Sequence, residues 1–276
     1  MAFRGLFYIT LTILITFLTV TETTAETTGY LYPPTNESLP QLTYSSQLMS
    51  FIQQTYQIQI KTMPPHATLN WQFDWNQPYL GAGSTLYNDL FSIMLWGGYV
   101  RAPQSNFEVI ALTLCHEVGH YLGGAPKQKI DSPTGDWASS EGQADWFATQ
   151  SCLPLVFDYF KKTNIQSLNF IYPTLTKKIC LQLDPHLDVQ QLEKCQWLVG
   201  SSAKFGEFIQ LHFAKDIAVP SLDQSAPEKP QQTLYSTYPS LQCRVDTLKQ
   251  GSLCATSSLT QKKSACVRPS CWFVEE

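Results

Sequence analysis

Charged residues are scarce in this chain of 276 residues: Asp, Glu, Lys and Arg make up 14% of it, and the formal net charge is −4. The sequence has no cluster of basic residues, which argues against nucleic acid as a partner. It has no C-x-x-C pair, which disfavours a cysteine-rich zinc site. Beyond residue 20 it has no apolar run approaching the roughly 20 residues of a membrane-spanning helix. These absences favour a globular protein without nucleic-acid or membrane partners.

The first 25 residues are typical of an export signal. Arg4 is followed by an apolar run from Leu6 to Val20 and by small residues, with Thr23 and Ala25 placed as at a cleavage site. An uncleaved membrane anchor is the alternative, but the apolar run is short for a spanning helix. We expect cleavage near Ala25, a secreted or periplasmic location, and one mature domain over residues 26–276 with a core at about 45–250. A monomer is favoured.

The cysteines support an exported protein, because their number is even and disulfides form outside the cytosol. Eight cysteines allow 105 pairings, so the connectivity is not readable from the sequence. The short-range pairs Cys180–Cys195, Cys243–Cys254 and Cys266–Cys271 are expected, which leaves Cys115 with Cys152. The segment 243–271 is then rich in disulfides.

The segment His116-Glu117-Val118-Gly119-His120 places a metal site and a base on one helical turn. Residues four apart share a helix face, so both imidazoles can reach one ion. Glu117 lies one position further round and can reach a water on that ion. In this HExxH pattern two histidines bind zinc and the glutamate is the general base. The pattern alone also occurs by chance, so its flanks decide its meaning.

Hydrophobic spacing predicts mainly helices. One helix begins at Ser105, whose capping box Glu108 completes, and ends before Gly123-Gly124. Residues 26–45 are rich in Pro and Thr and are expected to be a lead-in. The run from Leu86 to Arg101 is predicted to be a strand that is broken at Gly97-Gly98. Ser221 to Thr233 reads as a surface loop. Further helices are predicted at Gln47–Gln59, from Ser139 or Ser140 past Phe147, and at Leu153–Lys161, Val189–Leu198 and Ala203–Phe213.

A third metal ligand is expected from the helix that follows the motif, because catalytic zinc takes three protein ligands and keeps one position for water. Glu141 is the best candidate, and Asp145 shares its helix face four residues on. Asp145 would accept the outer N–H of a ligating histidine, for which we choose His116. The alternative is that both acids are solvated charges on a helix surface.

HExxH followed by E-x-x-x-D resembles the gluzincin zinc peptidases, and within them the group of the prenyl-protein endoproteases, the HtpX heat-shock proteases and their small soluble relatives. Two further blocks carry the resemblance. Asn88 to Val100 is similar to that group's N-A-F-x-x-x-G-G-Y strand, and Ser236 to Val245 is similar to its S-T-H-P-x-x-x-x-R-I motif. The resemblance covers Asn88 to Leu248. It implies an α+β fold, mostly helical and of zincin type, with a small sheet and one Zn²⁺ ion.

The last block departs from the group at one position, since Tyr238 stands where the group usually has His before Pro239. A tyrosine hydroxyl can also stabilise a developing oxyanion, so we assign that role to Tyr238; the alternative is a packed loop aromatic. Arg244 is expected to anchor the loop or a neighbouring carboxylate. The resemblance also implies that the strand near Ile93, Leu95 and Gly97 offers an edge to extended peptides.

These patterns together predict a secreted or periplasmic zinc endopeptidase acting on a peptide or protein substrate. Zinc is held by His116, His120 and Glu141, Glu117 is the general base, and Tyr238 stabilises the oxyanion. An aminopeptidase is disfavoured, because no G-x-M-E-N motif is present. A catalytically silent or latent binding protein with a zincin fold remains the alternative from outside the enzymes, although such a protein would not need Glu117.

Overall fold

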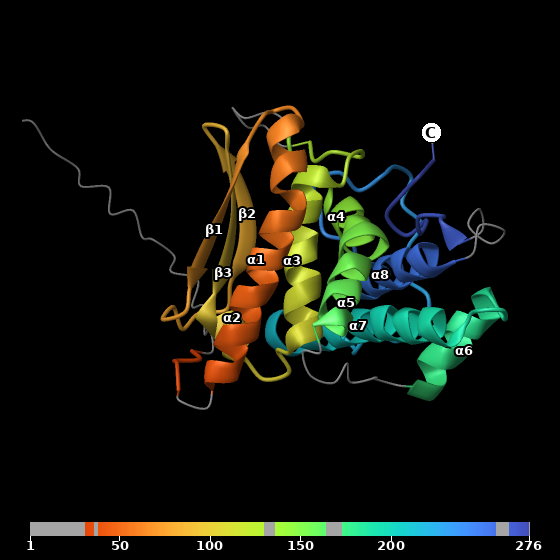
Figure 1. Cartoon of the computed structure of the whole chain (residues 1–276). Helices are drawn as coiled ribbons and strands as arrows, with labels where there is room; N and C mark the ends of the chain where they lie inside the picture. The colour runs from red at the N-terminus through yellow and green to blue at the C-terminus, as the bar shows by residue number, and fades with distance from the viewer. Residues whose placement is uncertain (1–30, 36–37, 130–135, 164–172, 258–264, 276) are drawn as a thin grey trace, which may run out of the picture.

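The computed structural model describes residues 31–35, 38–129, 136–163, 173–257 and 265–275. Helices dominate and one small sheet is present, which confirms the expected α+β class (Figure 1). The expected signal peptide, residues 1–25, lies outside the described residues. The elements are α1 (Leu39–Thr62), β1 (Thr68–Asp74), β2 (Ala82–Tyr87), β3 (Leu90–Trp96), α2 (Gly97–Arg101), α3 (Phe107–Leu122), α4 (Glu141–Phe147), a π-helical turn (Ala148–Cys152), α5 (Leu153–Lys162), α6 (Pro173–Leu183), α7 (Val189–Phe213) and α8 (Leu241–Thr256).

The sheet has the strand order β1-β3-β2, with β1 parallel and β2 antiparallel to β3. Asn88 and Asp89 join β2 to β3 with positive φ angles of 46° and 58°, which is the two-residue turn that matches the twist of paired strands. The run predicted as one strand, Leu86 to Arg101, therefore comprises the end of β2, this turn, β3 and α2. Gly97 begins α2 and lies against the carbonyl of Trp75, where a side chain does not fit.

Several helices differ from the sequence prediction. Asn106, not Ser105, caps α3, since the Asn106 side chain accepts a hydrogen bond from the Val109 N–H at 3.1 Å. α1 begins at Leu39, inside the stretch expected to be a lead-in. The helices predicted on either side of Gly200 are one helix, α7, in which the hydroxyls of Ser201 and Ser202 bond to carbonyls one turn earlier.

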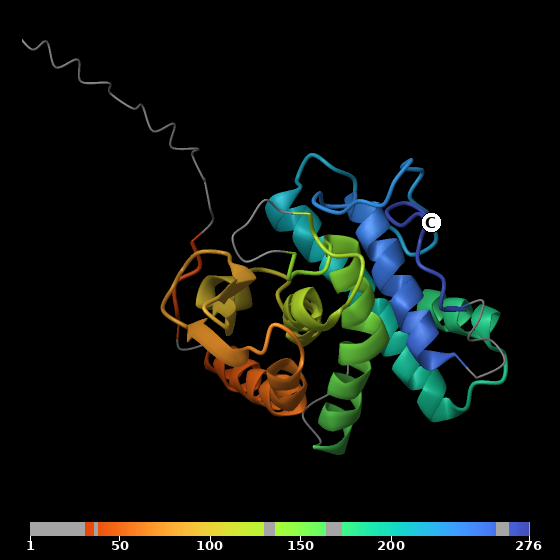
Figure 2. The ribbon, with the colours of Figure 1, turned by 90° about the horizontal axis from the view of Figure 1, so that it is seen from above.

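The sheet, α1 and α3 form one side of the molecule, and α8 and α6 lie on the far side of α4 and α5, whereas α7 runs from α6 back to α3 (Figures 1 and 2). A main core joins the two sides, and it includes Phe91 of β3, Leu112 of α3 and Trp197 of α7. α3 is central and has 15 buried residues out of 16. None of the helices in the described part of the chain is both long and apolar enough to cross a membrane.

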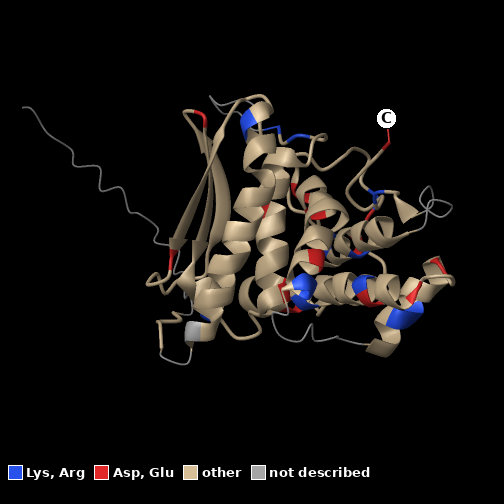
Figure 3. Ribbon diagram, viewed as in Figure 1, with Lys and Arg blue, Asp and Glu red and all other residues tan. Residues whose placement is uncertain are grey.

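Charged side chains lie mainly on the helical side, and the strands are almost free of them (Figure 3). Both signs occur together there. Lys194 bonds to Asp158 at 2.7 Å, and Lys204 of α7 pairs with buried Glu108 of α3 at 3.0 Å. These two ion pairs join α7 to α5 and to α3.

Four disulfides link the eight cysteines. Cys115–Cys152 and Cys180–Cys195 were predicted correctly. The other two predicted pairs are wrong: the bonds are Cys243–Cys271 and Cys254–Cys266. Cys243 and Cys254 both belong to α8, where eleven residues span about 16 Å, and a disulfide bridges Cα atoms about 7 Å apart at most.

Candidate metal centre

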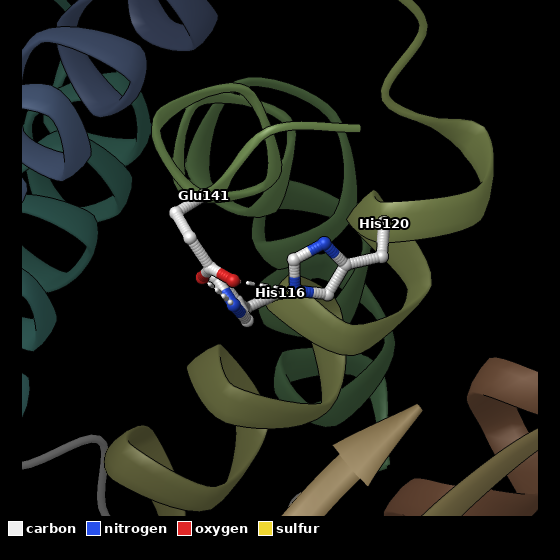
Figure 4. Close-up of side chains that lie close together, drawn as sticks. All are labelled: His116, His120 and Glu141. Atoms are coloured by element: carbon white, nitrogen blue, oxygen red, sulfur yellow. Dashed lines mark ion pairs between the residues drawn. The ribbon is translucent and has the colours of Figure 1, made fainter. Parts of the chain in front are cut away.

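Three buried side chains converge between α3 and α4. His116 and His120 lie one turn apart on α3, and Glu141 is the first residue of α4 (Figure 4). Nε2 of His116 lies 3.2 Å from one carboxylate oxygen of Glu141, and Nε2 of His120 lies 3.7 Å from the other. The three ligand atoms are within 4.8 Å of one another. This group can hold a metal ion.

The outer nitrogen of each imidazole has its own acceptor. Nδ1 of His116 lies 2.8 Å from Asp145, and Nδ1 of His120 lies 2.9 Å from the carbonyl oxygen of Ser139. Because a carbonyl only accepts, the proton of neutral His120 is on Nδ1, and its Nε2 lone pair faces Glu141. Both rings are thus turned so that Nε2 is the ligand atom, which is the orientation that a metal centre requires.

Asp145 is fully buried between His116 and Arg244. The guanidinium of Arg244 donates two hydrogen bonds to its carboxylate, at 2.8 and 2.9 Å. The predicted contact with His116 is present, and Arg244 anchors a carboxylate as expected. With Glu141 only 7% exposed and Asp145 0% exposed, the alternative that these acids are solvated surface charges is wrong.

The carboxylates set the protonation of the imidazoles when no cation lies between them. Burial alone would lower the pKa of His116, but Asp145 and Glu141 outweigh it and raise that pKa to about 10. Burial and the neighbouring His116 lower the pKa of His120. Burial works against ionised Glu141 and Asp145, yet the adjoining cations hold both pKa values below their usual range. The ionised carboxylate of Glu141 therefore faces both Nε2 atoms, which favours a bound cation.

Glu117 lies beside this group at the wall of two cavities. It is 7% exposed and borders two cavities, one of about 580 Å³ and one of about 210 Å³. His116 lines the larger cavity, whereas His120 and Glu141 line the smaller one. A molecule in either cavity therefore reaches both Glu117 and a ligand side chain.

Tyr238 borders both cavities as well. Tyr238 is 67% exposed, and the centre of its ring lies 5.4 Å from the guanidinium carbon of Arg244. Partial burial of the hydroxyl and the nearby carboxylate of Glu141 raise the pKa of Tyr238 to about 12. The hydroxyl therefore keeps its proton at neutral pH and can donate it in a hydrogen bond.

The substrate edge expected at Ile93, Leu95 and Gly97 is a wrong prediction. β3 is the central strand and bonds to a neighbour on each side, and Ile93 and Leu95 are 0% exposed. Gly97 has left the strand for α2. The edge strands of the described sheet are β1 and β2, and Ala82, Gly83 and Ser84 of β2 line the smaller cavity together with Glu117.

Two contacts at the centre escaped the sequence reading. The Ser139 carbonyl orients His120, and Gln128 donates a hydrogen bond from Nε2 to Glu141 at 3.3 Å. Both residues come from the connection between α3 and α4, where Lys127 and Ser139 form a β-bridge. A backbone carbonyl that accepts a hydrogen bond has no sequence signature, so the contact of Ser139 with His120 could not be predicted from the residue types.

Comparison of the chain with protein-family models, with curated proteins and with solved structures finds no match. The resemblance to the gluzincins thus rests on the residues of the centre and the blocks that flank it.

Proposed function

We propose that this protein is a secreted zinc-dependent endopeptidase. One observation carries the proposal: the Nε2 atoms of His116 and His120 and the carboxylate of Glu141 converge within 4.8 Å, with Glu117 next to them at the wall of an open cavity. Two imidazoles and one carboxylate are the ligands of many catalytic zinc sites. The four disulfides are typical of proteins that work outside the cytosol.

The same donor set also occurs in iron(II) oxygenases, where two histidines and one carboxylate occupy one face of the ion. Glu117 favours hydrolysis over oxygen chemistry. Its carboxylate lies at the cavity beside His116 and His120, where a hydrolase needs a base and an oxygenase needs none. Metal analysis separates the two, because zinc and iron are distinguished directly.

When bound, the ion supplies a Lewis acid that polarises a carbonyl group and acidifies water. Glu117 then takes a proton from the attacking water and passes it to the leaving amine. The Tyr238 hydroxyl donates a hydrogen bond to the oxygen that becomes negative during attack. Asp145 and Ser139 hold the imidazoles in place throughout.

The surroundings of the centre favour an extended peptide with a large apolar side chain. The free edge of β2 can pair with a peptide backbone, as sheet edges do in peptide recognition. Beside it, the larger cavity is walled by apolar side chains, among them Leu80, Phe205 and Ile209. A substrate that pairs with β2 would thus carry its scissile bond past Glu117 and place one side chain in this cavity.

The substitution Glu117→Gln tests the proposal, because it removes the base and keeps the size of the side chain. We expect the variant to bind zinc like the parent and to cleave casein or a peptide library at least about 100-fold more slowly, the usual contribution of general-base catalysis. Equal cleavage by both proteins would refute the mechanism. A parent that binds zinc but cleaves nothing in a broad peptide library would favour the alternative, a silent or latent binding protein with this fold.

A further inference from the structure

The first turn of α4 carries Glu141 but lacks the usual means of holding a helix end. Ser140 is the N-cap residue, yet its side chain makes no capping hydrogen bond, and its buried hydroxyl has no partner among the described residues. Uncapped helix ends fray, because their first N–H groups are unsatisfied. The position of Glu141 must therefore be fixed by contacts from outside α4.

One such contact comes from the far end of the chain. The indole of Trp272 lies directly on the backbone of α4 at Gly142, the residue after Glu141. A Cβ atom at position 142 would come within 2.6 Å of the indole Cε3 atom, so only glycine lets the ring approach this closely. Trp272 is 0% exposed and packs with Cys243, Cys271 and Ala226 in a small separate core.

Trp272 is itself held to the start of α8. The neighbouring Cys271 is bonded to Cys243, and the Trp272 carbonyl accepts a hydrogen bond from Leu234 at 2.9 Å. Cys243 directly precedes Arg244, which donates two hydrogen bonds to Asp145 of α4. The first turn of α8 thus holds α4 at two points, through Arg244 at Asp145 and through the disulfide and Trp272 at Gly142.

We propose that Trp272 is a positioning residue for the metal centre: the Cys243–Cys271 disulfide holds its indole on Gly142, and this contact places the Glu141 carboxylate opposite His116 and His120. The ring contacts the backbone of Gly142, next to Glu141, and is not one of the three metal ligands. Its effect is therefore on the affinity of the site for a metal. The inference rests on the metal centre alone and holds whether or not the protein cleaves peptides.

The variant Gly142→Ala tests this, because its methyl group pushes against the indole. We expect the Kd for zinc, measured by competition with a chromophoric chelator on folded protein, to rise about 10- to 100-fold, the range seen when support around metal ligands is lost. In the double variant Gly142→Ala/Trp272→Phe the smaller ring makes room, and most of the affinity returns. Gly81→Ala is the matched control: this glycine also lies directly against an indole, that of Trp96 at the end of β3, and the Kd of this variant for zinc should stay within about threefold of the parent.

A second pair of variants gives a test that does not depend on Gly142→Ala folding. Cys243→Ser/Cys271→Ser frees Trp272, whereas Cys180→Ser/Cys195→Ser removes the bond between α6 and α7, away from the centre. Only the first pair should weaken zinc binding. Parent-like affinity in folded Gly142→Ala or in the first cysteine pair, or equal losses in test and control, would overturn the inference. A parent that binds no zinc would instead refute the proposed function.

Discussion

The two helices that provide the metal ligands are held in place by different means. α3 has 16 residues, a capping side chain at Asn106 and a buried surface along nearly its whole length. α4 has seven residues and no capping side chain, and its ligand Glu141 is its first residue. The backbone of the two histidines is therefore fixed by their own helix, with Asp145 and Ser139 orienting the rings, whereas the backbone of Glu141 is fixed by its neighbours. Changes to α3 and to the contacts of α4 should have different consequences.

The largest effect is expected when a ligand is removed from either helix. His116→Ala, His120→Ala and Glu141→Ala should each reduce bound zinc from about one ion per chain to nearly none, because three protein ligands are the usual minimum for catalytic zinc. Metal analysis after dialysis measures this. His212→Ala is the control, since His212 bonds to the Pro103 carbonyl away from the centre. An unchanged zinc content in Glu141→Ala would show that α4 provides no ligand to the site.

A smaller loss is expected when the support of a ligand is changed. Asp145→Asn keeps the size of the side chain but removes the charge that orients His116 and pairs with Arg244. Zinc affinity should fall about 10- to 100-fold. Competition titration measures the change, with Asp158→Asn as a control at an exposed ion pair on α5. Equal affinities for Asp145→Asn and the parent would show that the imidazole needs no such partner.

The raised pKa of His116 predicts how metal binding depends on pH. In the zinc-free protein this imidazole has a pKa of about 10, so at neutral pH zinc must displace its proton. Zinc affinity should rise about tenfold for each pH unit between pH 6 and 8. The stability of the zinc-free fold should depend on pH in the opposite direction and fall as the pH rises. Protonated His116 stabilises the fold fully below the ordinary pKa of 6.5, and this contribution is lost as the pH rises through about 10. Denaturant unfolding in EDTA at pH 7 and pH 9 checks the second part, and a stability that rises with pH would contradict it.

The smallest effect concerns the stability of α3 itself. Asn106→Ala removes the hydrogen bond to the Val109 N–H and should lower the free energy of unfolding by about 1 kcal/mol, a typical cost for a lost N-cap. Because the rest of α3 is buried on all sides, zinc affinity should not change. Urea unfolding and a zinc titration on the same variant check both statements. A large loss of zinc affinity would show that the position of α3, like that of α4, depends on contacts at its first turn.

The same difference explains which features the sequence predicted. The spacing of His116 and His120 is local, and so is the pair Glu141 and Asp145, so helix periodicity placed each pair on one face, and the need of zinc for a third ligand joined them. The edge position of β2 was missed, because the strand order depends on the parallel pairing of β1 with β3, which are separated in the chain by β2. The bond from Cys243 to Cys271 was missed for a similar reason. It depends on where the chain returns after α8, and no local pattern encodes that path.

The most direct test of the metal centre is anomalous X-ray scattering at the zinc edge from crystals of zinc-loaded protein. We predict one peak per chain, bounded by Nε2 of His116, Nε2 of His120 and the Glu141 carboxylate, and its loss in Glu141→Ala. No peak at this position, or a peak that remains in Glu141→Ala, would contradict a centre built from both helices.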